Sequence, residues 1–110
     1  MRADHLVLAG GGHSHALLLR RWAMYPKRRP AGLITLINRR STALYSGMVP
    51  GLIAGDYKRD EIAIDLRSLS DQAGVALVIA EIKGVDAAKH HLVLCGRSPI
   101  HFERLSINVG

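Results

Sequence analysis

The amino-acid sequence predicts an α/β fold built on a parallel sheet. Two short apolar runs of strand-forming residues, at 5–10 and 33–38, lie on either side of a segment with helical periodicity at 14–24. Three glycines end the first run, directly before the helical segment. Strands that are joined through a helix in this way pair in parallel, with a right-handed crossover between them. The chain therefore opens with a β–α–β unit, and residues 1–110 are predicted to form part of a single domain.

The helical segment has apolar side chains at positions 16, 19, 22 and 23, which is the spacing of one buried helix face. Arg20 and Arg21 fall outside this face, and their positive charge suits the C-terminal half of a helix. Prolines at positions 26 and 30 end the helix before the second strand begins.

Residues 39–58 break this pattern, because they hold three glycines and a proline. We expect a loop there, with at most one short helical turn, and a long loop in a compact domain is usually functional. A second helix follows, with Asp65 as its N-cap and Gly74 as its C-cap. The apolar run after it predicts a third buried strand over 75–82.

The end of the sequence has a different character. Short alternating pieces at 90–95 and 100–103, separated by a turn at 96–99, predict an antiparallel β-hairpin inserted into the parallel sheet. A last strand is predicted over 104–110.

The chain is basic, with 15 Lys and Arg against 9 Asp and Glu and a pI of about 10.1. Seven of these cations fall within residues 20–40. Such a cluster suits a nucleic acid, an anionic membrane surface or an acidic partner, or it is simply a solvated helix end and loop. One Trp, one Phe and three Tyr offer few platforms for stacking bases, so no nucleic-acid partner is expected.

The remaining residue types exclude several kinds of site. A single cysteine, Cys95, rules out an internal disulfide and a metal site built on several cysteines, and it favours a reducing cytoplasm. The histidine pairs at 13 and 15 and at 90 and 91 point to opposite faces, so no metal site is expected. No run reaches the roughly 18 apolar residues of a membrane span. A cytoplasmic protein is expected, with peripheral contact through residues 20–40 at the inner face of a membrane left open.

The glycines after the first strand are typical of a phosphate-binding turn. Gly10 permits the tight turn, Gly12 lets the backbone approach a pyrophosphate, and the helix N-terminus offers N–H groups and partial positive charge. The fingerprint G-x-G-x-x-G requires a third glycine where this chain has His15. That glycine normally allows close packing of helix and strand, so the departure affects packing rather than phosphate contacts. The alternative to a phosphate-binding role is that these glycines only make a tight connection between the strand and the helix.

The second part of the fingerprint is an acidic residue at the end of the next strand, which binds a ribose hydroxyl. This chain has Asn38 there, followed by Arg39 and Arg40. An asparagine can still form a hydrogen bond with a ribose hydroxyl, and the arginines also suit the phosphorylated ribose of NADP.

Six segments together resemble a known family, in the family's order and over nearly the whole chain. They are LVLAGGGHSHALLLRR, ITLINRR, LYSGMVPGLIAGDY, IDLRSLSDQAGV, AEIKGVDAAKHHLVL and RLSINVG. The chain resembles the N-terminal part of the pyridine nucleotide-disulfide oxidoreductase superfamily and, within it, the NADH dehydrogenase-like FAD proteins. It is most similar to the flavoprotein module that occurs joined to selenide, water dikinase, a subgroup that tolerates the histidine at position 15.

This resemblance implies a Rossmann-like FAD/NAD(P)-binding fold and a set of FAD-binding positions. Gly10 and Gly12 would line the pyrophosphate, below His13 and Ser14. Asn38 and Arg39 would meet the adenosine ribose, and the backbone of Glu81 and Ile82 would reach the adenine. The remaining implied positions are Ser46, Gly47, Met48 and Pro50 on the flavin side, and Gly110 in the Asn-Val-Gly that stands for the family's Ala-Thr-Gly.

The resemblance also implies a reaction class. No cysteine lies within residues 39–58, where the disulfide reductases of this superfamily carry a redox-active pair, so the flavin would transfer electrons directly. NAD(P)H would be the electron donor, bound by a domain absent from this chain, and residues 1–110 would be an FAD domain incomplete at its C-terminus and inactive alone. No catalytic acid, base or nucleophile is predicted. The alternatives are another Rossmann-type NAD(P)- or nucleotide-binding enzyme, and a basic, non-enzymatic module that binds nucleic acid or a membrane surface.

Overall fold

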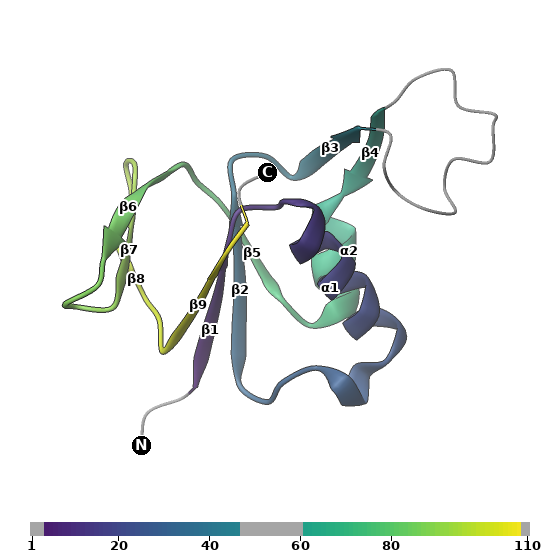
Figure 1. Ribbon diagram of the computed structural model, residues 1–110, viewed down its shortest axis with the longest axis horizontal. Coiled ribbons are helices and arrows are strands. Elements are labelled where there is room, and N and C mark those ends of the chain that lie inside the picture. Colours follow the sequence, from purple (N-terminus) through teal and green to yellow (C-terminus); the bar gives the residue numbers. More distant parts are fainter. Residues whose placement is uncertain (1–3, 47–60, 109–110) are drawn as a thin grey trace.

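The computed structural model describes residues 4–46 and 61–108. Its centre is a four-stranded sheet in the order β5-β2-β1-β9 (Figure 1). These strands are β1 (His5–Ala9), β2 (Leu33–Asn38), β5 (Ala76–Ile79) and β9 (Arg104–Ile107). Every pairing between them is parallel, which confirms the predicted α/β fold. Because the strands run in one direction, their carboxyl ends lie at one edge of the sheet.

Both predicted helices cover the same face of this sheet (Figure 1). They are α1 (His13–Met24), which a 3₁₀ turn η1 (Pro26–Arg28) follows, and α2 (Leu66–Ala73). The Asp65 carboxylate accepts hydrogen bonds from the backbone N–H groups of Arg67 and Ser68, at 3.0 and 3.2 Å. Gly74 ends α2 in the left-handed conformation. Both caps predicted for this helix are therefore confirmed.

A small antiparallel sheet lies on the other side of the parallel sheet (Figure 1). Its strands are β6 (Ile82–Asp86), β7 (His91–Leu94) and β8 (Ile100–His101). The pairing of β7 with β8 confirms the predicted hairpin. His90 lies before β7 with a positive φ and stacks on Phe102 rather than taking a strand position.

The predicted strand over 75–82 is wrong at its C-terminal end. β5 stops at Ile79, and Ile82 already belongs to β6. The sequence hides β6 because its pairing with β7 shifts register between Ile82 and Gly84, which disrupts the regular alternation of side chains. Val85, the apolar residue after this shift, is 45% exposed.

The loop predicted over 39–58 is also wrong at its start. Thr42–Ser46 forms strand β3, which pairs antiparallel with β4 (Glu61–Asp65). Local turn signals do not predict β3, because its partner strand β4 lies more than ten residues further along the chain. The glycines that follow β3 favour a loop instead. Residues 47–58 lie outside the described residues.

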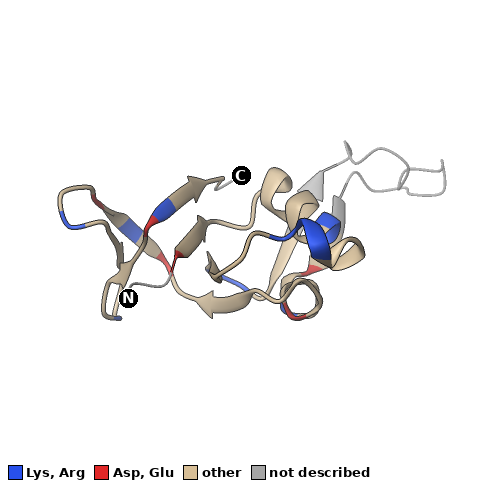
Figure 2. Ribbon diagram, turned by 90° about the horizontal axis from the view of Figure 1, so that it is seen from below, with Lys and Arg blue, Asp and Glu red and all other residues tan. Residues whose placement is uncertain are grey.

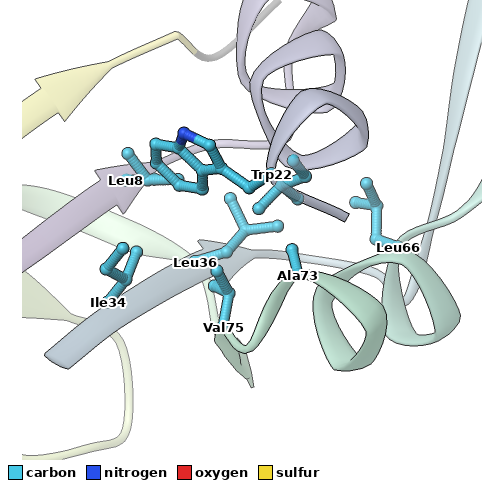
Figure 3. Close-up of a cluster of buried hydrophobic side chains, with 8 residues drawn as sticks. Leu8, Trp22, Ile34, Leu36, Leu66, Ala73 and Val75 are labelled. Carbon is cyan, nitrogen blue, oxygen red and sulfur yellow. The ribbon is translucent and has the colours of Figure 1, made fainter. Parts of the chain in front are cut away.

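Side chains from both faces of the parallel sheet are buried, which explains why its two central strands, β1 and β2, are mainly apolar runs. On the helix side, Figure 3 shows Trp22 of α1 and Ala73 of α2 pointing toward Leu8 and Leu36 of the sheet. The alternate residues of the strands pack under the small antiparallel sheet. This second cluster consists of Val7, Ala9, Ile37, Ala80, Leu92, Leu94 and Phe102.

Candidate functional site

The segments that carry the predicted site residues meet at the carboxyl edge of the parallel sheet. The glycine turn follows β1, Arg39 follows β2, Ala80 and Glu81 follow β5, and Asn108 follows β9. In open α/β sheets, ligands bind in the crevice outside the carboxyl ends of the strands. The topology therefore places these residues where a ligand site is expected.

Gly10 makes the tight turn that the sequence predicts. Its φ is 93°, a conformation that residues with a side chain rarely adopt, and its N–H donates to the carbonyl of Ile37 at 2.7 Å. Gly12 lies close to another segment of the chain. A Cβ atom on Gly12 would meet the side-chain oxygen of Asn108 and lie 2.6 Å from that residue's backbone oxygen. The close approach at Gly12 is therefore that of the segment after β9.

Asn108, which lies in the segment after β9, accepts two hydrogen bonds at the start of α1. Its carbonyl accepts from the Gly12 N–H at 2.8 Å, and its side-chain oxygen accepts from the Ser14 N–H at 3.1 Å. These are N–H groups of the kind that a helix N-terminus presents to a phosphate. The sequence resemblance includes Asn108 in the Asn-Val-Gly motif but predicts Gly110, and not Asn108, as a cofactor residue. The signal that points to Asn108 is a polar residue directly after a strand that ends at this edge of the sheet.

His15 is buried, with 2% of its surface exposed, where the fingerprint has its third glycine. Its Nδ1 lies 2.7 Å from the Gly10 carbonyl oxygen, and its Nε2 lies 2.8 Å from Ser106 Oγ. Burial lowers the pKa of His15 below its ordinary value, and the hydrogen bond with Gly10 opposes this shift only in part. The substitution therefore does more than alter helix packing, because the imidazole bridges the glycine turn and β9.

Asn38 also holds the turn. Its side-chain oxygen accepts from the Gly11 N–H at 3.1 Å, and its amide nitrogen donates to the Arg40 carbonyl at 2.9 Å. The sequence predicts that this side chain contacts a ribose. In the structure it is bonded to the backbone of the glycine turn and to the backbone of the segment that follows β2.

A pocket of about 260 Å³ lies beside the turn at this edge. It is lined by Gly10, Asn38, Arg39, Ala80, Glu81 and Ile82. Five of these six are predicted cofactor residues. The sixth, Ala80, was missed, although it follows β5 at the same edge. The Glu81 carbonyl accepts from the Cys95 N–H at 2.9 Å, so part of the backbone expected at the adenine is bonded to the hairpin instead.

The other predicted residues do not line this pocket. Gly12, His13 and Ser14 lie at the start of α1, and His13 lines a separate, mainly apolar groove of about 250 Å³ between α1 and α2. Ser46 is the last residue of β3. The remaining predicted positions, Gly47, Met48, Pro50 and Gly110, lie outside the described residues.

The basic cluster of residues 20–40 is not one surface. Arg29 donates to the carbonyls of Ala73 and Gly74 at the end of α2, while Arg39 lies in the pocket at the opposite end of β2. Figure 2 shows cationic residues both near the helices and on the antiparallel sheet. Arg20, Arg21, Lys27 and Arg28 remain exposed near the end of α1.

Two further features concern metals and membranes. Within residues 4–46 and 61–108, no group of three or more His, Cys, Asp and Glu side chains could hold a metal ion. Over the same residues, no helix has the length and apolarity needed to cross a membrane.

Comparison with known proteins extends the fold assignment. No family model matches the chain, and no curated protein gives a significant match. Among solved structures, the chain is similar to the sulfide:quinone oxidoreductase from the hyperthermophilic bacterium Aquifex aeolicus, with 23% identity and a TM-score of 0.70. The match covers 98% of this chain and 24% of that chain. The fold is therefore that of the Rossmann-like α/β domains. This chain spans about a quarter of the length of that neighbour.

Proposed function

We propose that this chain binds the adenosine diphosphate half of FAD at the carboxyl edge of its parallel sheet, as the first part of the FAD domain of a flavin oxidoreductase. One observation carries the proposal. Gly10, Asn38, Arg39, Glu81 and Ile82 come from three separate segments, and they line one pocket. The family resemblance selects these residues for a single ligand, and the Rossmann-like fold binds ligands at this edge.

The chemistry of the pocket fits the adenosine end of a dinucleotide. Gly10 and Ala80 leave space at its wall, and Arg39 brings a cation that suits a phosphate or a ribose hydroxyl. When bound, FAD would supply the hydride and electron chemistry, while the protein supplies binding and orientation. The chain's own residues would hold the adenosine end at the carboxyl ends of β2 and β5, with the phosphates toward the start of α1.

Asn108 adds a condition to this binding. Its side-chain oxygen accepts from the Ser14 N–H, so a phosphate that binds this N–H must displace the Asn108 side chain. The exchange replaces a neutral acceptor with a charged one, and charged hydrogen bonds are the stronger kind. Phosphate binding and a rotation of the Asn108 side chain are therefore coupled in the proposed site.

The finer assignment follows the resemblance. We propose an NADH dehydrogenase-like flavoprotein of the kind joined to selenide, water dikinase, with NAD(P)H as electron donor bound outside this chain. Residues 39–58 lack cysteine, which supports direct electron transfer without a redox-active dithiol. The single cysteine of the chain supports a cytoplasmic setting.

The test compares ligands on the purified chain. FAD is titrated while flavin fluorescence anisotropy is followed, with ADP, FMN, NAD and NADP as competitors. We expect FAD and ADP to bind and FMN to fail, because the pocket serves the adenosine end. If NAD or NADP binds tightly and FAD does not, the chain is another Rossmann-type nucleotide-binding protein. No binding of any of these ligands by the folded chain contradicts a nucleotide site.

Two neighbouring arginines give a matched pair of variants. Arg39 lines the pocket, whereas Arg40 does not, although both are exposed. Arg39→Ala should raise the Kd for FAD by about tenfold, since a hydrogen bond with a charged group contributes about 1.5 kcal/mol or more. Arg40→Ala should leave the Kd within about twofold of the wild type. Equal effects of the two substitutions would place the cofactor elsewhere.

A further inference from the structure

We propose that His15 is a positioning residue for the cofactor turn, and that it replaces the fingerprint glycine with a bridge between this turn and β9. The inference rests on the proposed function, because it concerns how the same site is held for FAD. In the usual fingerprint, the third glycine contributes only the absence of a side chain. Here a buried imidazole fills that space and makes two hydrogen bonds.

The partners of the imidazole define its tautomer. A backbone carbonyl oxygen can only accept a hydrogen bond, so Nδ1 of His15 carries the proton and donates to Gly10 at 2.7 Å. In the neutral ring, Nε2 is then an acceptor, and the Ser106 hydroxyl donates to it at 2.8 Å. Both ring nitrogens are therefore engaged with the protein, each by a group on a different strand or turn.

The hydrogen bond from His15 restrains Gly10, the residue whose conformation makes the turn. Gly10 has a positive φ, and its N–H is bonded to the Ile37 carbonyl of β2. His15 holds the carbonyl of the same residue, so both polar groups of Gly10 are engaged. These two hydrogen bonds restrict the peptide groups on both sides of Gly10.

β9 and the segment after it approach the turn at more than one point. Ser106 bonds His15, and Asn108 bonds the N–H groups of Gly12 and Ser14. A glycine at position 15 would remove the connection between Ser106 and Gly10, so that the Asn108 contacts alone would tie the turn to the segment after β9 and would open more often. His15 therefore connects the glycine turn to β9 through its two hydrogen bonds.

Restoring the family glycine tests this role directly. His15→Gly recreates G-x-G-x-x-G, so a merely tolerated histidine predicts equal or tighter FAD binding. The bridge predicts the opposite, a Kd for FAD at least about tenfold higher, because buried hydrogen-bonding groups lose their partner. Leu17→Gly is the control, since it puts the same flexible residue into α1 at an exposed position. Its Kd should stay within about twofold of the wild type.

Variants of Ser106 provide a second measurement that does not disturb the helix. Ser106→Ala should raise the Kd for FAD about threefold to tenfold, the range for one neutral hydrogen bond. Ser106→Thr keeps the hydroxyl and should restore the affinity. In the His15→Gly background, Ser106→Ala should have no additional effect. All Kd values are taken at temperatures where each variant is folded, so that a loss of stability alone does not change them.

Hydrogen exchange on the ligand-free protein separates this inference from the proposed function. The amides of Gly12 and Ser14 should exchange faster in His15→Gly than in the wild type and in Leu17→Gly. A wild type that fails to bind FAD overturns the proposed function, and the inference with it. A wild type that binds FAD no better than His15→Gly overturns the inference alone. If His15→Gly does not fold, equal Kd values for Ser106→Ala and Ser106→Thr overturn it.

Discussion

Replacing Arg29 with alanine should destabilise the fold far more than its place in a basic loop suggests. The guanidinium donates to the carbonyls of Ala73 and Gly74, which end α2, with its shortest contact to Gly74 at 2.8 Å. It also donates to Pro30 and Gly32 in its own loop, at 2.7 and 3.1 Å. Arg29 therefore holds the loop before β2 against the C-terminal end of a helix more than 40 residues away.

The magnitude follows from these contacts. Hydrogen bonds from a charged donor contribute about 1.5–3 kcal/mol when buried, and a cation near a helix C-terminus adds about 0.3–1 kcal/mol. Because Arg29 is only half-buried, we expect Arg29→Ala to lower the free energy of unfolding by about 2 kcal/mol. For a domain of this size, the melting temperature should fall by roughly 8–16 °C.

Urea unfolding followed by circular dichroism measures this loss, with Arg28→Ala as the neighbouring control. Arg28 is exposed, and its guanidinium lies 5.3 Å from the centre of the Tyr25 ring, a contact that contributes about 0.5–1 kcal/mol at an exposed site. Arg29→Lys keeps the charge but loses the planar fork, so it should recover less than half of the loss. Equal losses for Arg29→Ala and Arg28→Ala, or full recovery with lysine, would refute the assigned role.

Two further predictions concern the core and the buried histidine. Leu36→Ala, at a fully buried position, should lower the free energy of unfolding by about 2–5 kcal/mol. Leu33→Ala, at a side chain that is 52% exposed, should lower it by well under 1 kcal/mol. Similar losses for the two variants in urea titrations would contradict the packing in Figure 3. Burial lowers the pKa of His15, so the unfolded chain binds a proton below pH 6.5 more readily than the folded chain. Stability from this residue should be full above pH 6.5 and should fall as the pH drops below it, by at most about 1.4 kcal/mol per pH unit. Unfolding curves between pH 7.5 and 5.5 should therefore be steeper in pH for the wild type than for His15→Asn, and parallel pH profiles would contradict a neutral, buried imidazole.

Local signals predicted much of this fold. The apolar runs around Leu8 and Leu36 mark central parallel strands, because both of their faces are covered. Asp65 and Gly74 mark the ends of α2, because a cap is satisfied within a few residues of its own position. Such features need no knowledge of the rest of the chain.

The features that the sequence did not predict depend on distant partners. β3 is defined by its pairing with β4, and β6 is hidden by a register shift that only its partner strand makes visible. At the candidate site, the predicted cofactor residues Arg39 and Glu81 line one pocket, because the carboxyl ends of parallel strands share one edge of the sheet. The side-chain roles of His15, Asn108 and Arg29 rest on contacts with residues from 44 to 94 positions away, which no local pattern contains.

The contacts of Asn108 with the start of α1 also set the order in which this site can be completed. The segments that bind each other there are separated by 94 positions, nearly the whole of the described chain. During synthesis, Ser14 is added 94 residues before Asn108, whose side chain accepts a hydrogen bond from it. Contacts between residues so far apart in sequence form late, because a long loop must close first. A nascent chain would therefore carry its glycine turn without this contact until Asn108 has been made.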